Sequence, residues 1–186
     1  MTQLKEKSKQ VLAELAQVFD LIDEKKIDIL LTKIVAAERV FLMGIGREGL
    51  ATRAFAMRLM HCGKDVHWVW DDTTPNVTDK DLFIFTSGSG EIGHIDYVMN
   101  EVKKYDPEIV LFTGVPDRKS AAVADLVVWV PAEVFNGDDR TVPSTQLMGS
   151  LFEQSLLILF DLIVSLYVEK EKLDVKEIVE RHRNFE

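Results

Sequence analysis

Residues 82–91 read Leu82-Phe83-Ile84-Phe85-Thr86-Ser87-Gly88-Ser89-Gly90-Glu91, an apolar run that passes directly into a turn of small polar residues. Apolar residues then recur at helical spacing between residues 95 and 102. This order predicts a strand, a turn and the start of a helix. Glycines let the backbone approach a ligand, and the serine hydroxyls and unpaired N–H groups of the helix's first turn can bind an anion. The stretch therefore indicates a phosphate site, although an ordinary turn with a serine cap has the same composition.

A second turn, Gly44-Ile45-Gly46-Arg47-Glu48-Gly49, follows the apolar run at 40–43. Two such turns at neighbouring strand ends favour a small phosphorylated ligand held between them. The second turn also matches the G-x-G-x-x-G pattern, and Asp71-Asp72 lies near the spacing of a ribose-binding carboxylate. A nicotinamide dinucleotide-binding oxidoreductase is therefore an alternative, but it leaves the polar turn at 87–91 without a role.

The alternation of strand and helix patterns along the chain predicts an α/β fold. Two amphipathic helices precede the first strand, and apolar runs then alternate with helical patterns. Short strands that are apolar on both faces and separated by helices form parallel, doubly wound sheets, whose ligands bind at the carboxyl edge. We expect residues 1–186 to form one domain, a three-layer αβα sandwich with an N-terminal helical extension. The expected strands of its five-stranded sheet are 40–43, 66–70, 82–86, 109–113 and 126–130. The later helices are 49–62, 92–105, 120–124, a helix that Gly149-Ser150 opens and that contains the apolar segment 156–168, and 175–183.

The composition restricts the classes of partner. A net charge of −9 argues against nucleic-acid and anionic-membrane surfaces, whereas helix N-termini can still hold a small phosphate. Cys62 is the single cysteine, and the four histidines lack metal-motif spacing, so we expect no metal and no cofactor. The charged N-terminus lacks a signal peptide's apolar core, which predicts a cytoplasmic protein. The apolar segment 156–168 contains Asp161 and is short for a bilayer span, so it predicts a buried helix that also contacts another subunit.

Taken together, these segments resemble the sugar isomerase (SIS) domain and, within it, the 6-phospho-3-hexuloisomerases of the ribulose monophosphate pathway. The resemblance implies a three-layer αβα fold, a homotetramer with sites shared between subunits, and no organic cofactor. It also implies the interconversion of 3-hexulose 6-phosphate and fructose 6-phosphate through an enediol. The segments that carry it are Gly46-Arg47-Glu48-Gly49, Phe55-Ala56-Met57-Arg58-Leu59-Met60-His61, Thr74-Pro75, Ser87-Gly88-Ser89-Gly90-Glu91, Met148-Gly149-Ser150-Leu151-Phe152-Glu153-Gln154 and His182-Arg183-Asn184-Phe185-Glu186.

The chain departs from this family in its two phosphate-binding turns. Glu48 stands where the family has serine after Gly-Arg, and Ile92 stands where it has threonine after Ser-Gly-Ser-Gly-Glu. A carboxylate beside a phosphate dianion would oppose its binding, and isoleucine removes a hydroxyl donor. Alternatively, Glu48 turns away and pairs with Arg47 or Arg53, which leaves backbone N–H groups to hold the phosphate.

The expected reaction assigns roles to particular residues. Glu153 is the candidate base, since partial burial at an apolar helix start would raise its pKa, and its alternative role is a helix cap. His61 and His182 are candidate proton shuttles. A SIS protein that binds a sugar phosphate as a sensor without turnover remains a second functional hypothesis, motivated by Glu48 and Ile92. The candidate substrate-binding residues are Gly46, Arg47, Glu48, Ser87, Gly88, Ser89, Gly90, Glu91 and Ile92.

Overall fold

The computed structural model describes residues 2–185 and contains one five-stranded sheet in which all strands are parallel. The strand order is β2-β1-β3-β4-β5. The central strand β3 is buried along its whole length, as expected for a strand of apolar residues covered on both faces. This sheet confirms the predicted fold class. The strands are β1 (Arg39–Met43), β2 (Asp65–Trp68), β3 (Leu82–Thr86), β4 (Glu108–Thr113) and β5 (Leu126–Trp129).

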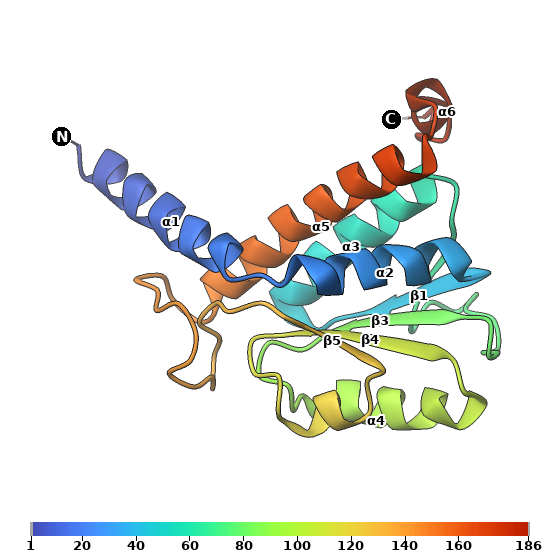
Figure 1. Cartoon of the computed structure of the whole chain (residues 1–186), viewed down its shortest axis with the longest axis horizontal. Helices are drawn as coiled ribbons and strands as arrows, with labels where there is room; N and C mark the ends of the chain where they lie inside the picture. The colour runs from blue at the N-terminus through green and yellow to red at the C-terminus, as the bar shows by residue number, and fades with distance from the viewer. Residues whose placement is uncertain (1, 186) are drawn as a thin grey trace.

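Helices cover the two faces of the sheet unequally. On one face α2, α3 and α5 pack together over a large apolar core, and α4 covers the other face over a smaller core that contains Phe41, Phe83 and Phe85 (Figure 1). These layers form the predicted αβα sandwich. The helices are α1 (Gln3–Asp20), α2 (Glu24–Ala36), α3 (Gly46–His61), α4 (Gly93–Val102), α5 (Ser150–Glu171) and α6 (Val175–Glu180), with short 3-10 turns η1 (Lys103–Tyr105) and η2 (Lys119–Ala122).

The order of the strands places a crevice between the carboxyl ends of β1 and β3. After β1 the chain crosses to β2 on one side and then returns to β3 on the other, so this is the topological switch of the sheet. Met43 pairs with Phe85 in the register, and the two glycine turns follow these residues. A Cβ on Gly44 would lie 2.2 Å from Thr86 Oγ1 and 2.9 Å from Gly49 Cα, so only glycine allows this approach. The turns at 44–49 and 87–91 are therefore adjacent, as predicted.

Helix α5 begins at the predicted Gly149-Ser150 turn but is less enclosed than the sequence predicted. It begins at Ser150, where Met148 and Gly149 both adopt positive φ and turn the chain into the helix, and it ends at Glu171, before Lys172 in the left-handed conformation. Leu157, Leu162 and Leu166 are 43–47% exposed, so the prediction of a helix buried on most sides was wrong for this face. By length and composition alone α5 would also suit a membrane span. In this fold, 44% of its apolar window is buried against the rest of the chain.

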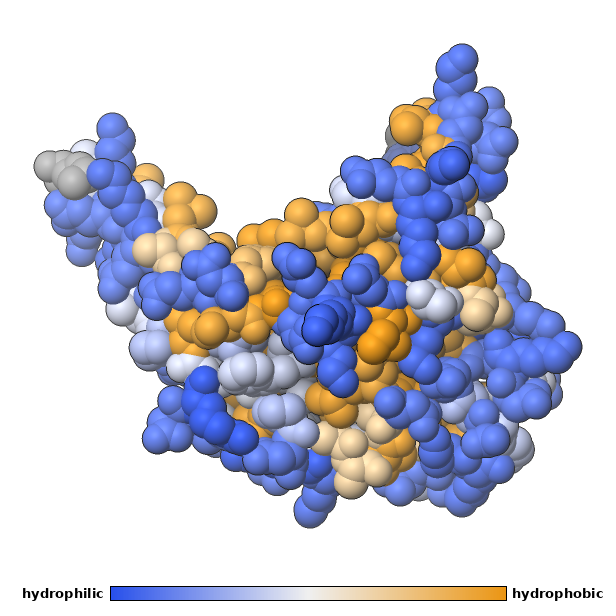
Figure 2. Space-filling view, viewed as in Figure 1, coloured by the Kyte–Doolittle hydropathy of each residue, from blue (hydrophilic) through white to orange (hydrophobic). Residues whose placement is uncertain are grey.

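Helix α1 extends away from the body of the molecule, and α6 rises at the opposite end of α5 (Figure 1). Between these two projections, Figure 2 shows hydrophobic residues gathered in the region of α5, interrupted by hydrophilic side chains. We call the exposed apolar residues Leu157, Ile158, Leu162 and Leu166 the α5 stripe. Exposed apolar side chains that gather on one helix are typical of a surface that another protein chain covers.

Candidate active site

A pocket of about 290 Å³ lies at the topological switch of the sheet. This volume is at the lower end of the range for small-ligand pockets. Four segments form its wall: the start of α3, the turn after β3, the loop between β5 and α5, and the first turn of α5. We call it the switch pocket. Its lining residues are Ile45, Gly46, Arg47, Glu48, Gly88, Ser89, Ile92, Val134, Phe135, Asn136, Met148, Gly149, Phe152 and Glu153.

Glu48 joins the two glycine turns at the base of this pocket. Its side chain is almost fully buried, and its Oε2 accepts a hydrogen bond of 2.8 Å from the backbone N–H of Gly88. Its Oε1 is also buried and has no hydrogen-bond partner among the described residues. Burial raises the pKa of Glu48 to about 8; the Gly88 hydrogen bond lowers it and the charge of Glu153 raises it further. Glu48 therefore accepts the hydrogen bond of a backbone N–H group that would otherwise be available to a ligand anion.

The alternative in which Glu48 turns outward to an arginine was wrong. The guanidinium of Arg53 lies over the ring of Trp68, with 4.0 Å to the ring centroid. Arg47 Nη1 lies 2.7 Å from Glu153 Oε2 and donates a hydrogen bond of 2.9 Å to Ser150 Oγ. Both arginines thus have partners elsewhere, and the carboxylate of Glu48 points into the space between the turns because the Gly88 amide faces it there.

Glu153 lies at the start of α5, on the wall of the switch pocket. Burial raises the pKa of its carboxyl above the ordinary value, and the charge of Arg47 lowers it in part. Among the described residues, no hydrogen bond joins this carboxylate to the first-turn N–H groups of α5, so the helix-cap role is not supported. The geometry leaves Glu153 a partly buried carboxylate beside a cation, which is a suitable environment for a general base.

The predicted substrate-binding residues fall into two groups, those that line the switch pocket and those that do not. Gly46, Arg47, Glu48, Gly88, Ser89 and Ile92 line the switch pocket. Ser87, Gly90 and Glu91 do not, because Ser87 is fully buried beneath the turn, the Gly90 N–H donates to the Ser87 carbonyl, and Glu91 pairs with Arg118.

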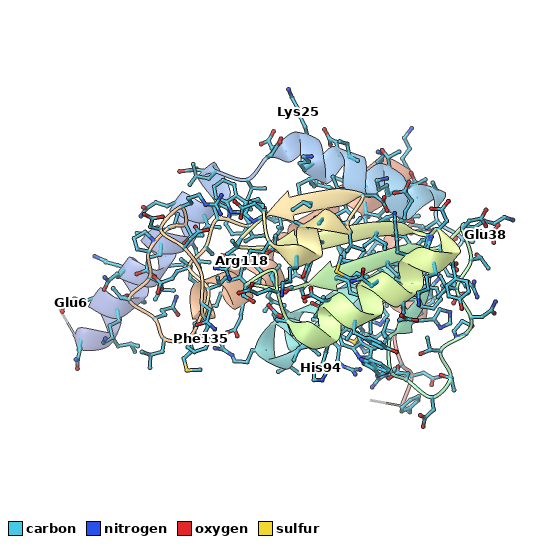
Figure 3. The ribbon with its side chains drawn as sticks, turned by 90° about the horizontal axis from the view of Figure 1, so that it is seen from below. Glu6, Lys25, Glu38, His94, Arg118 and Phe135 are labelled. Atoms are coloured by element: carbon cyan, nitrogen blue, oxygen red, sulfur yellow. The ribbon has the colours of Figure 1, made fainter. Side chains whose placement is uncertain are left out.

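Arg118 is a residue that the sequence analysis missed. Its Nη1 lies within 3.2 Å of three acceptors, the Ser89 carbonyl, Glu91 Oε1 and the Asn136 carbonyl. Figure 3 shows Arg118 beside the loop that carries Phe135. Arg118 thereby fixes the turn at 87–91 against the opposite wall of the pocket. Its position after the end of β4, at the carboxyl edge of the sheet, was the signal that could have identified it.

Glu14 of α1 holds the same loop from outside. Its buried carboxylate accepts hydrogen bonds from Ser144 Oγ at 2.8 Å and from the Thr145 N–H at 3.1 Å. A buried charge with several donors is stable only when those donors stay in place. The position of α1 and the wall of the switch pocket are therefore coupled through this carboxylate.

The two candidate histidines lie together but far from the switch pocket in the same chain. The ring centroids of His61 and His182 are 5.2 Å apart, and His61 is buried. His61 ends the 16-residue helix α3, whose first turn lines the pocket. A helix of this length separates its ends by about 22 Å. Within one chain, Glu153 and the glycine turns lie at the start of α3. His61 and His182 lie at its other end. Within residues 2–185, no three His, Cys, Asp or Glu side chains form a group that could hold a metal ion.

Comparisons with known proteins agree with this fold. The family model described as "SIS domain" matches residues 33–158. A 3-hexulose-6-phosphate isomerase from Mycobacterium gastri is 36% identical, covering 93% of this chain and 86% of the relative. Its counterpart of the same name from Bacillus subtilis (strain 168) is 33% identical, with 95% and 96% covered. A crystal structure from Methanococcus jannaschii, for which a function as a 3-hexulose-6-phosphate isomerase has been inferred, superposes with a TM-score of 0.84 at 30% identity, covering 97% of this chain and 99% of that one.

Proposed function

This chain belongs to the SIS domain family, and from that premise we propose that it is a ketose-phosphate isomerase that interconverts 3-hexulose 6-phosphate and fructose 6-phosphate. The observation that carries the proposal is the switch pocket, where a partly buried carboxylate, Glu153, faces two glycine turns. Such turns at the start of helices hold a phosphate, and the carboxylate supplies the base that a carbonyl shift requires. Membership of this family sets aside the nicotinamide alternative.

The proposed reaction moves one carbon-bound proton. Glu153 removes the proton from C2 of the 3-hexulose while the C3 carbonyl oxygen takes up a proton, which forms the 2,3-enediol. The proton is then returned to C3, and the hydroxyl on C2 loses its proton as the new carbonyl forms. Arg47 lies beside Glu153, and its charge favours the ionised base at the start of this cycle.

We assign the phosphate to the space between Gly88, Ser89 and the start of α4. Ser89 supplies a hydroxyl, and the first-turn N–H groups of α4 supply donors and the positive end of a helix dipole. A phosphate fixed there positions the sugar against Glu153 on the opposite wall. This positioning reduces the entropic cost of the chemical step.

We propose further that the active protein is a homotetramer in which His61 and His182 serve a neighbouring chain's pocket. Two observations support this: the α5 stripe is exposed, and the two histidines lie at the far end of α3 from their own switch pocket. Subunits that meet along α5 would bring opposite ends of α3 together. A cytoplasmic location and a role in the ribulose monophosphate pathway complete this proposal.

A second function, sugar-phosphate sensing without turnover, is favoured by one observation: the carboxylate of Glu48 occupies the Gly88 amide. Incubation with fructose 6-phosphate in deuterated water separates the two functions. An isomerase incorporates solvent deuterium at C3 of fructose 6-phosphate through the enediol, and the Glu153→Gln variant does not. Binding of fructose 6-phosphate without incorporation by the wild type would leave the sensor hypothesis.

A further inference from the structure

The two oxygens of the Glu48 carboxyl have different surroundings. Oε2 accepts the Gly88 N–H at 2.8 Å, while Oε1 is buried and lacks a hydrogen-bond partner among the described residues. The side chain is only 7% exposed, and it lines the switch pocket. A buried charged oxygen without a donor is costly, because it loses hydration and gains nothing in return.

Protonation of Oε1 removes this cost. A neutral carboxyl keeps its acceptor oxygen on the Gly88 amide, and the hydroxyl becomes a hydrogen-bond donor that an ionised carboxylate does not possess. The neighbouring charges agree with this state. Burial and the nearby Glu153 carboxylate both raise the pKa of Glu48, so that it exceeds the ordinary value of a glutamate.

The charged groups around Glu48 are few. Among the described residues, Arg47 and Glu153 are the other ionisable side chains on the wall of the pocket. Arg47 is directed to Glu153, and beyond the turn Arg118 is engaged by Glu91 and by backbone carbonyls. Both arginines are thus held by other partners, and within residues 2–185 no ion pair to Glu48 is formed that would keep it ionised.

Resting on the sugar-phosphate function proposed above, we propose that Glu48 acts in the binding step as a carboxylic acid, with Oε2 on the Gly88 amide and the Oε1 hydroxyl donating to the phosphate of the sugar. Glu48 then contributes to phosphate recognition rather than opposing it. When a phosphate dianion binds to protein in which Glu48 is ionised, Glu48 must take up one proton from the solvent, so binding is linked to proton uptake. The same linkage makes Glu48 a residue that restricts sugar-phosphate binding at alkaline pH.

Isothermal titration of the full chain with fructose 6-phosphate tests this inference. The second pKa of a phosphate ester is about 6, so the ester is fully dianionic across the alkaline range. With a pKa of about 8 for free Glu48, the wild-type Kd should rise about tenfold between the limiting value and about pH 9. Repeating the titration in buffers of different ionisation enthalpy should reveal an uptake that approaches one proton at about pH 9 and is close to zero at about pH 7.

Glu48→Gln is the matched control variant. Its amide retains an acceptor for Gly88 and a donor for the phosphate, and it cannot ionise, so its Kd should stay constant over the same pH range with no proton uptake. Glu153→Gln removes the charge that raises the pKa of Glu48, so its affinity should begin to fall at a lower pH than that of the wild type.

Three results would count against the inference in distinguishable ways. Wild-type binding that is independent of pH and of buffer overturns the role of Glu48 and leaves the isomerase intact. A pH dependence that Glu48→Gln shares assigns the titration to another group and also overturns it. Failure of both proteins to bind fructose 6-phosphate at any pH overturns the proposed function and this inference with it. If Glu48→Gln does not fold, the buffer dependence of the wild type alone decides the question.

Discussion

The carboxylate of Glu48 accepts a hydrogen bond from the backbone N–H of Gly88, with 2.8 Å between Oε2 and the amide nitrogen. This bond links the first turn of α3 to the turn after β3, the two segments from which the switch pocket is built. An internal acid therefore engages a donor at the position where a ligand anion is expected. Its protonation affects both the stability of the fold and the charge that the ligand meets.

The stability of the protein should depend on pH through Glu48. Because the folded pKa is raised from 4.5 to about 8, the folded state binds more protons than the unfolded state between these values. This contribution to the free energy of unfolding is complete below about pH 4.5 and is lost as the pH rises through about 8. Glu48→Gln should abolish this loss. In urea denaturation, the free energy of unfolding of the variant relative to wild type should therefore increase as the pH rises from about 4.5 to about 8, and then stay constant.

Glu6→Gln, a change of an exposed carboxylate in α1, is the control for that measurement. Its unfolding curve should follow that of the wild type at each pH. For a protein of this size, each kcal/mol of difference corresponds to about 2–4 °C in Tm. A constant gap between Glu48→Gln and wild type across the range would show that Glu48 is ionised in the folded state.

Replacing the candidate base should separate binding from chemistry. Glu153→Gln retains the shape of the side chain and removes its basicity, so deuterium incorporation into fructose 6-phosphate should be abolished while the Kd stays within about tenfold of wild type. Exchange followed by mass spectrometry measures the first quantity and calorimetry the second. Exchange at the wild-type rate would return Glu153 to a structural role.

Arg47 should set the pH range in which Glu153 works. The guanidinium lowers the pKa of Glu153, so Arg47→Met should raise that pKa and move the acid limb of the kcat/KM profile to higher pH. Arg47→Lys retains a positive charge and should shift the limb less. If all three profiles coincide, the ion pair does not tune the base.

Restoring the two family residues tests the phosphate-binding turns. Glu48→Ser with Ile92→Thr supplies two hydroxyl donors that cannot ionise in the working range. At about pH 7, where Glu48 is largely neutral, the gain in affinity for fructose 6-phosphate should be small. Above about pH 9 it should reach tenfold or more, equivalent to about 1.4 kcal/mol. An equal gain at both pH values would mean that Glu48 opposes the phosphate irrespective of its protonation.

The α5 stripe should be required for assembly. Leu162→Glu places a charge within this stripe, so light scattering should detect a smaller species than the wild type. Tyr97→Glu changes an exposed residue on α4, on the opposite face of the sheet, and should leave the mass unchanged. If dissociation also reduces deuterium exchange into fructose 6-phosphate, Glu153→Gln and His182→Ala chains can be mixed. Exchange by the mixed oligomers will reveal whether His182 of one chain serves the pocket of a neighbouring chain.

Much of this architecture follows from local sequence patterns. The five strands, their parallel arrangement and the two glycine turns were predicted because short apolar runs and period-3.6 patterns depend on residues close together in the chain. The same reasoning located the pocket, since the carboxyl ends of parallel strands lie at one edge and glycines mark a close approach there. Glu153 was identified in the same way, from its place at an apolar helix start.

The direction and partners of the site's side chains were decided by tertiary structure alone. Glu48 meets Gly88, Arg47 meets Glu153 and Arg118 meets Asn136 only after strand register and helix packing bring these distant positions together. The local pattern of a single segment cannot predict these contacts. It also cannot predict that α3 places His61 far from the pocket. The protonation of Glu48 is likewise a tertiary property. A glutamate in the unfolded chain is hydrated and ionised at neutral pH, and only burial between the two turns reverses that preference.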